Sequence, residues 1–125
     1  MNIIDSSCWI EYLMDSEIGE NVAPVIENTD ELIVPTITIY EVYKKLSLEK
    51  DDAYAQEVAS YMQTGMVIDL NASLSINAAD VSRKYKLAMA DSIIYATALN
   101  YSAVIYSCDE HFENFHNVRY FPKTK

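Results

Sequence analysis

Short apolar runs alternate with longer segments of helical periodicity along almost the whole chain. Apolar runs of this length, bounded by turn-forming or charged residues, are typical of buried strands. We expect five strands, at Asn2–Ile4, Leu32–Val34, Met66–Leu70, Ala103–Tyr106 and Val118–Phe121. Pro35 closes the second of these runs.

Between these runs, apolar residues recur every three or four positions, which predicts amphipathic helices. The expected helical segments are Cys8–Met14, Ile18–Ile26, Ile39–Leu46, Tyr54–Met62, Leu74–Tyr85 and a last one from Asp91, closed by Asn100. Pro24 weakens the second segment, and Gly65 is well placed to end the fourth. The stretch KLAMADSIIYATAL, residues 86–99, is apolar on nearly every side after its aspartate, so this helix should be buried.

Strands that alternate with helices imply parallel pairing through crossover helices. A parallel sheet of this kind is covered by helices on both faces. The sequence shows no internal repeat, low-complexity segment or linker. We therefore expect a single α/β domain over residues 1–125.

Net charge, hydropathy and cysteine content indicate which classes of protein fit this sequence. The formal net charge of −10 argues against non-specific nucleic-acid binding, which needs a basic face, although a site for divalent cations would itself be acidic. From charge alone, a solubilising acidic surface is the simpler interpretation. The start MNIIDSSCWI lacks a basic signal region, and no apolar run reaches the roughly 18 residues of a membrane span. Together with two cysteines a hundred positions apart, this favours a cytoplasmic protein with reduced thiols and no membrane contact.

Four acidic residues fall where a parallel sheet binds its ligands, beyond the carboxyl ends of the strands. Asp5 ends the first strand and Asp109 follows the fourth, while Glu41 and Asp91 lie early in helices that border the same edge. Hard divalent cations prefer oxygen ligands of this kind. With one or two Mg²⁺ or Mn²⁺ ions, such a cluster can activate water and stabilise a phosphoryl transition state.

Each of these acids also has a structural interpretation. Glu41 could complete a capping box with Thr38 or pair with Lys45, and Asp5 and Asp91 could be N-caps. Asp109 could be a turn residue. These interpretations leave the shared edge as a coincidence, so a common site is favoured. Asp69 also ends a strand, but no partner segment points to it, and we interpret it as structural.

With these residues in place, the chain resembles a PIN domain, specifically the VapC toxins. The resemblance rests on IIDSSCWIEYL, TITIYEVYKKL, MADSIIYATAL and IYSCDEHFENF, in this order and spacing, and covers nearly the whole chain. It implies a three-layer α/β/α domain and a metal-dependent endoribonuclease. It also implies a VapB-like antitoxin as partner, and homodimers are usual in the family.

Carried over by position, the resemblance makes Asp5, Glu41, Asp91 and Asp109 the catalytic residues and the ligands of Mg²⁺ or Mn²⁺. Ser6 and Ser107 match the small hydroxyl residues that support the first and last acids. Two departures stand out: KLAMAD has no glycine before the third acid, and Ser92 follows that acid where alanine is usual. The first concerns the local loop shape, and the second leaves the carboxylate unchanged.

Five basic residues flank the segments of Glu41 and Asp91 and could hold RNA phosphates: Lys44, Lys45, Arg83, Lys84 and Lys86. Solvated helix faces explain them equally well. Tyr40 and Tyr43 could stack on bases, but their spacing is more typical of core residues. We interpret His111 and His116 as surface residues and Cys8 and Cys108 as buried or half-buried thiols without a nucleophilic role.

Three other functions remain open at this stage. A phospho-receiver domain would place Asp5, Asp69, Ser107 and Lys123 after successive strands, but receivers carry an acidic pair where this chain has IIDSS. That function also leaves Glu41 and Asp91 without a role. An inactive PIN scaffold does not explain the intact set of four acids. A housekeeping PIN nuclease of RNA processing has the same residues as a toxin.

Overall fold

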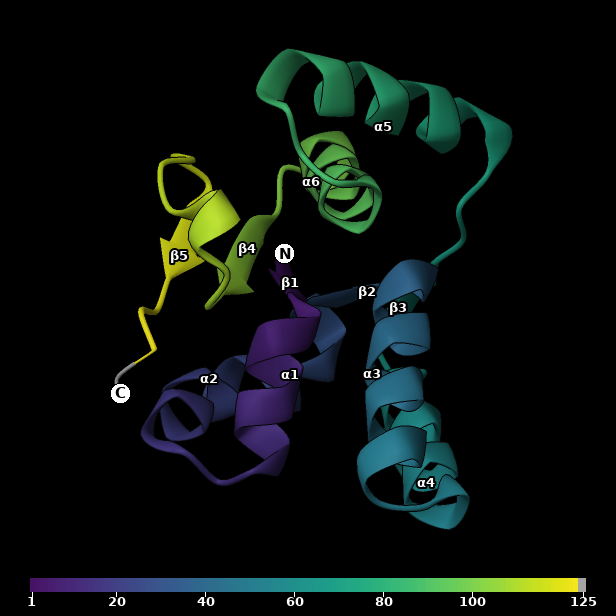
Figure 1. Ribbon diagram of the computed structural model, residues 1–125, viewed down its shortest axis with the longest axis vertical. Coiled ribbons are helices and arrows are strands. Elements are labelled where there is room, and N and C mark those ends of the chain that lie inside the picture. The colour runs from purple at the N-terminus through teal and green to yellow at the C-terminus, as the bar shows by residue number, and fades with distance from the viewer. Residues whose placement is uncertain (124–125) are drawn as a thin grey trace.

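A parallel sheet forms the centre of the computed structural model, which describes residues 1–123 (Figure 1). Its strands are β1 (Asn2–Ile4), β2 (Leu32–Pro35), β3 (Met66–Ile68), β4 (Val104–Ser107) and β5 (Val118–Tyr120). They lie in the order β3-β2-β1-β4-β5, and every neighbouring pair is parallel. The predicted parallel sheet is therefore confirmed, and β1 is its middle strand.

Helices cover both faces of the sheet, which confirms the three-layer α/β/α fold (Figure 1). The helices are α1 (Ser6–Leu13), α2 (Glu17–Glu27), α3 (Thr36–Glu49), α4 (Asp52–Met62), α5 (Ala72–Tyr85) and α6 (Met89–Tyr101), with short 3₁₀ turns at Thr29–Glu31 and Glu110–Phe112. The layer of α5 and α6 lies on one face, and α1 to α4 lie on the other. Among residues 1–123, no helix is both long and apolar enough to cross a membrane.

Side chains that alternate between the two faces of the sheet let each short strand pack against both helical layers. Successive strand side chains point to opposite faces of a sheet. Ile3 therefore packs against α5 and α6, while Ile4 packs with the layer of α1 to α4. Ile33 and Val34 of β2 divide in the same way. Each of these side chains is at most 1% exposed, and burying one stabilises the fold by roughly 1.5–3 kcal/mol.

Several element ends differ from the sequence predictions by a few residues. For example, β3 ends at Ile68 instead of Leu70, and α6 begins two residues before Asp91. Pro24, expected to weaken the second helical segment, lies within α2. The prediction that Asn100 closes α6 is wrong. The helix continues to Tyr101 and ends where Ser102 takes a left-handed conformation with φ 51°. That conformation lets the next N–H groups bond back to the last carbonyls of the helix.

Candidate active site

The middle of the sheet brings two of the four acids together directly. β1 and β4 are neighbours, and the Asp5 N–H donates to the carbonyl of Tyr106 at 2.9 Å. Asp5 and Asp109, which follow these two parallel strands, therefore lie at the same edge of the sheet, beyond the carboxyl ends of the strands. Glu41 reaches it from the second turn of α3, and Asp91 from the first turn of α6. The negative charges of Asp5, Asp91 and Asp109 all act on Glu41, so the four predicted site residues share one locality.

Asp5 is the most enclosed of these acids, with 3% of its surface exposed. Its Oδ1 accepts the Ser6 N–H at 2.9 Å, which makes Asp5 the N-cap of α1. Its Oδ2 accepts two hydroxyls, from Ser107 at 2.8 Å and Ser7 at 3.0 Å. These donors fix the carboxylate in one orientation and leave Oδ1 with room for a further ligand.

The hydroxyls of Ser7 and Ser107 link the two strand ends into one network. Ser107 Oγ accepts the Asp109 N–H at 2.9 Å, and Ser7 Oγ accepts the Cys108 N–H at 3.1 Å. The prediction singled out Ser107 but missed Ser7. The run of two serines after Asp5 carried that signal, because the second serine of a helix start can turn its hydroxyl back to the capping aspartate. The Ser6 hydroxyl instead acts on Glu41, where its hydrogen bond lowers the pKa.

Burial and mutual repulsion raise the pKa of three of the acids. Burial is the largest cause of the raised pKa of Asp5, although its three hydrogen-bond donors oppose the change. Burial also leads for Glu41, followed by the charge of Asp5. The pKa of Asp91 rises to about 6 through burial and the charges of Asp5 and Asp109, against the opposing effect of His111. The site therefore holds more negative charge than its own surroundings neutralise.

His111 was expected at the surface, and its side chain is indeed 64% exposed, yet it contacts two of the acids. Its Nδ1 lies 3.2 Å from Asp109 Oδ1 and 3.4 Å from Asp91 Oδ2. One donor atom from each of the three residues lies within 4.8 Å of the other two, a spacing suited to one metal ion. The Asp109 carboxylate also accepts the backbone N–H of His111 at 2.9 Å. The tight turn that this hydrogen bond closes brings the His111 imidazole next to the acids.

The structural interpretations fail for Glu41 and Asp91 and hold for the other two acids. α3 begins at Thr36, so Thr38 lies inside the helix, and the predicted capping box does not form. Lys45 pairs with Glu49 at 2.7 Å and not with Glu41. The N-cap position of α6 belongs to Ala88. Glu41 and Asp91 thus have no helix-capping role, whereas Asp5 and Asp109 both cap the turns that follow them.

The other residues singled out from the sequence lie partly on the surface and partly in the core. All five basic residues are exposed, and within residues 1–123 none forms an ion pair with any of the four acids. Tyr40 is 60% exposed with the Lys44 ammonium 5.9 Å from its ring centre, so the core interpretation is wrong for Tyr40. Tyr43 is half-buried. Cys8 and Cys108 are both buried, as expected.

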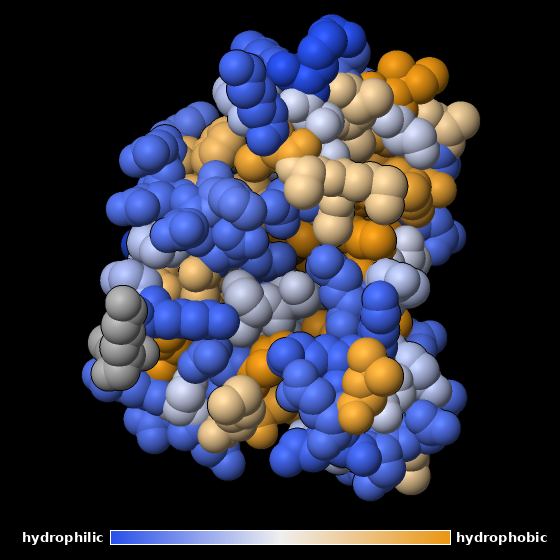
Figure 2. Space-filling model, in the orientation of Figure 1, coloured by the Kyte–Doolittle hydropathy of each residue, from blue (hydrophilic) through white to orange (hydrophobic). Residues whose placement is uncertain are grey.

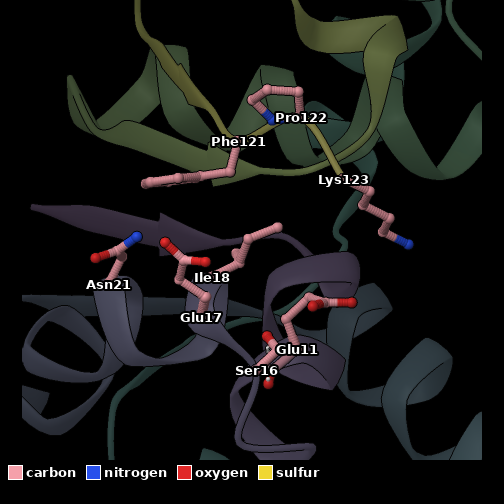
Figure 3. A pocket seen from close by; sticks show the side chains of 8 residues that line it. All are labelled: Glu11, Ser16, Glu17, Ile18, Asn21, Phe121, Pro122 and Lys123. Atoms are coloured by element: carbon pink, nitrogen blue, oxygen red, sulfur yellow. Dashed lines mark hydrogen bonds between the residues drawn. The ribbon is translucent and has the colours of Figure 1, made fainter. Parts of the chain in front are cut away.

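A polar cavity of about 300 Å³ lies elsewhere, between α1, α2 and the segment after β5 (Figure 3). In Figure 3, Phe121 and Pro122 form one wall and Glu17 and Ile18 face them. None of the four acids lines this cavity. The candidate site is the acidic edge of the sheet, and this cavity lies apart from it.

The PIN domain matches residues 3–117, a span that starts in β1 and contains all four acids. The chain belongs to the PIN domain family. Membership of this nuclease family supports a hydrolytic activity for the chain. Among curated proteins, none matches the sequence.

Solved structures agree with this PIN fold over almost their whole length. A toxin–antitoxin complex from Klebsiella pneumoniae is similar with TM-score 0.76 and 18% identity, over 95% of this chain and 96% of that one. DNA-bound VapBC from Salmonella typhimurium gives TM-score 0.71 and 17% identity, over 97% and 98%. The sarcin–ricin loop cleaving VapC toxin of Mycobacterium tuberculosis gives TM-score 0.72 and 13% identity, over 95% of this chain and 99% of that one. At these identities, the likeness establishes the fold.

The strand order also rules out the phospho-receiver. A receiver has the order 2-1-3-4-5, with the first strand second from the edge. Here the order is 3-2-1-4-5, and Asp69 is exposed beyond the edge strand β3. The PIN family match and the strand order together exclude the phospho-receiver function.

Proposed function

We propose that this PIN domain is a metal-dependent endoribonuclease that acts as a single domain, of the VapC toxin type. One observation carries the proposal: four carboxylates from separate segments converge, and two of them, Glu41 and Asp91, have no capping role of their own. Raised pKa values at Asp5, Glu41 and Asp91 support a requirement for positive charge at this edge. A divalent cation would supply that charge.

The donor set fits Mg²⁺ or Mn²⁺. Asp5, Glu41, Asp91 and Asp109 offer carboxylate oxygens, which hard cations prefer, and His111 offers a nitrogen that suits Mn²⁺ better than Mg²⁺. When bound, such an ion lowers the pKa of water and offsets the charge of a phosphoryl transition state. The chain's own part is orientation: Ser7 and Ser107 hold Oδ2 of Asp5, so a cation would bind through Oδ1, which also accepts the Ser6 N–H.

A VapB-like antitoxin and a second copy of the chain are the partners we propose, beside the RNA substrate. The structures from Klebsiella pneumoniae and Salmonella typhimurium are toxin–antitoxin complexes of the same fold. Apolar surface on the upper part of the molecule supports self-association (Figure 2). Exposed apolar side chains on and beside α5 and α6 include Leu70, Ile76 and Met89. An RNA substrate and two unpaired thiols fit a cytoplasmic protein.

The direct test is cleavage of end-labelled RNA by the purified chain with Mn²⁺, beside DNA of the same sequence. We expect internal RNA fragments and intact DNA. Equal cleavage of DNA, or a ladder shortened from one end, would contradict an endoribonuclease. A short upstream reading frame with a DNA-binding N-terminal part would distinguish a toxin from a housekeeping nuclease, since the antitoxin and toxin would share an operon.

Replacing Lys44 and Lys45 together with alanine should weaken RNA binding and flatten its salt dependence. Each lysine that neutralises a phosphate contributes just under one unit to the slope of log affinity against log salt, so the slope should fall by roughly one to two units. Filter binding with metal-free protein at several salt concentrations measures this. Lys50→Ala, at the far end of α3, serves as control and should leave the slope unchanged. Equal slopes for all three proteins would assign Lys44 and Lys45 to a solvated helix face.

Asp91→Asn should stabilise the metal-free protein at pH 7. The folded pKa of Asp91 is about 6, above its ordinary value, so the folded state binds the extra proton between about pH 4 and 6. Its contribution to stability is therefore complete below pH 4 and lost as pH rises through 6. Asparagine avoids that loss but gives up the favourable helix dipole, for a net gain of about 1–2 kcal/mol. We expect a melting temperature roughly 3–8 °C higher in EDTA.

Circular-dichroism melts of both proteins from pH 3.5 to 7.5 provide the readout. The difference between them should vanish near pH 4 and grow toward pH 7. Added Mg²⁺ should stabilise the wild type by mass action and the variant much less. An Asn variant that melts below the wild type in EDTA and responds equally to Mg²⁺ would remove Asp91 from the proposed metal site.

A further inference from the structure

Two thiols from distant parts of the chain meet beside the acidic edge. Cys8 Sγ and Cys108 Sγ lie 3.4 Å apart, although the residues are 100 positions apart in the sequence. Cys8 is 0% exposed and Cys108 is 6% exposed, so the pair is enclosed but nearer to solvent on the side of Cys108. Neither residue has a role in the proposed hydrolysis.

Both cysteines are tied to the site by short connections. Cys8 lies in the first turn of α1, and its N–H donates to the Asp5 carbonyl at 3.0 Å. Cys108 directly precedes Asp109, and its N–H donates to Ser7 Oγ, which in turn donates to Asp5. A displacement of Cys108 therefore acts on Asp109 through the backbone and on Asp5 through Ser7.

We propose that Cys8 and Cys108 are a redox modification site, whose disulfide displaces Asp109 and reversibly switches off the acidic edge. The loss of cleavage rests on the proposed nuclease function, whereas the disulfide and the displacement do not. Disulfides in reducing compartments are typically transient and redox-sensing, which suits a pair that is free in the reduced protein.

A peroxide is the oxidant that fits this enclosed pair, because it is small. The Cys108 sulfur attacks one peroxide oxygen, the O–O bond breaks, and a sulfenic acid and one water result. The Cys8 sulfur then attacks the Cys108 sulfur, the S–O bond breaks, and a second water leaves. Two thiols and one H₂O₂ thus give one disulfide and two waters, with two electrons passing from sulfur to oxygen. A dithiol reverses the change by thiol–disulfide exchange.

Bond formation requires movement at one side of the pair. A disulfide is about 2.05 Å long, so the sulfurs must come about 1.4 Å closer. Cys8 is held within α1, whereas Cys108 lies between β4 and the following 3₁₀ turn, outside regular structure. Cys108 should therefore move, and the Asp109 N–H should lose its 2.9 Å bond to Ser107 Oγ. Misplacement of a site group by about 1 Å can cost roughly a hundredfold in rate.

The test compares the full chain before and after stoichiometric H₂O₂. Mass spectrometry with thiol alkylation should show the loss of two hydrogens and no alkylated cysteine. Hydrogen exchange at the Asp109 amide should accelerate at least about tenfold. The melting temperature in EDTA should rise by at least about 5 °C, because the bond closes a long loop. Mn²⁺ affinity and RNA cleavage should fall at least about tenfold, and a dithiol should restore all five properties.

Cys8→Ala is the matched control, since it cannot form the bond. Under the same peroxide it should keep its Mn²⁺ affinity, and a loss there would assign the effect to oxidation of Cys108 alone or of methionine instead of to the disulfide. If that variant does not fold, Cys108→Ala takes its place. Failure of the folded wild type to form the bond, or an unchanged Asp109 amide after it forms, would overturn the inference. Absence of Mn²⁺ binding and RNA cleavage in the reduced protein would contradict the proposed nuclease function. The mass spectrometry and hydrogen-exchange data would still decide whether Cys8 and Cys108 form a disulfide that displaces Asp109.

Discussion

Protein treated with EDTA is expected to lose RNA cleavage by at least about a thousandfold, and Mg²⁺ or Mn²⁺ should restore it. The loss follows from the composition of the site, which offers four carboxylates and within residues 1–123 no lysine or arginine paired with them. Without a cation, these groups repel the phosphate that they must hold. Removing one electrostatic contact costs about 100- to 1,000-fold in other enzymes, and an ion held by several ligands should cost at least as much.

Timed cleavage of labelled RNA during metal titration measures this dependence. Protein of the Asp5→Asn variant, purified in the same way, controls for contaminating ribonucleases. Undiminished cleavage in EDTA by the wild type, absent from the variant preparation, would show that the site works without metal. A stronger response to Mn²⁺ than to Mg²⁺ would agree with the nitrogen that His111 adds to the donor set.

Asp5→Asn is expected to lower the cleavage rate at least about a hundredfold in saturating Mg²⁺. The substitution removes the charge of the acid whose orientation the structure fixes most firmly. It also places an amide NH₂ against either the Ser6 N–H or the two hydroxyls that now donate to Oδ2. The Asn variant therefore loses both a ligand and the orientation of its neighbours.

Asp69→Asn supplies the matched control, because Asp69 also follows a strand but is exposed and outside the acidic edge. That variant should cleave RNA like the wild type. Circular dichroism should show that both variants are folded. Near wild-type cleavage by Asp5→Asn would exclude Asp5 from catalysis, and an equal loss in both variants would point to general charge instead of a defined site.

The fold could be predicted from sequence because its signals are local and repeated. Five apolar runs and the helices between them establish the parallel sheet. The enclosed α6 was also visible, since Ser92–Ala98 offers no polar face and every residue in it is buried. Strand and helix ends were less accurate, because they depend on backbone conformations such as that of Ser102, which side-chain patterns do not encode.

The site could be predicted only as a set of acids at one edge. Their convergence follows from topology, but their surroundings depend on contacts between residues far apart in the sequence. The two serines after Asp5 are a local signal for the bond from Ser7 to Asp5, but nothing local indicates that Ser7 also accepts the Cys108 N–H, or that His111 contacts both Asp91 and Asp109. The catalytic and metal-binding roles of the four acids stay predictions until the experiments above are done.

The central strand carries a consequence for synthesis of the chain. β1 is made before one of its two partners, β4, which begins about a hundred residues later in the chain. Asp5 therefore meets Ser107 and Asp109 only after the hundred or so residues between them have been made. Contacts of such long range also slow folding. A nascent chain therefore lacks the assembled acidic edge until β4 and the residues directly after it have been made.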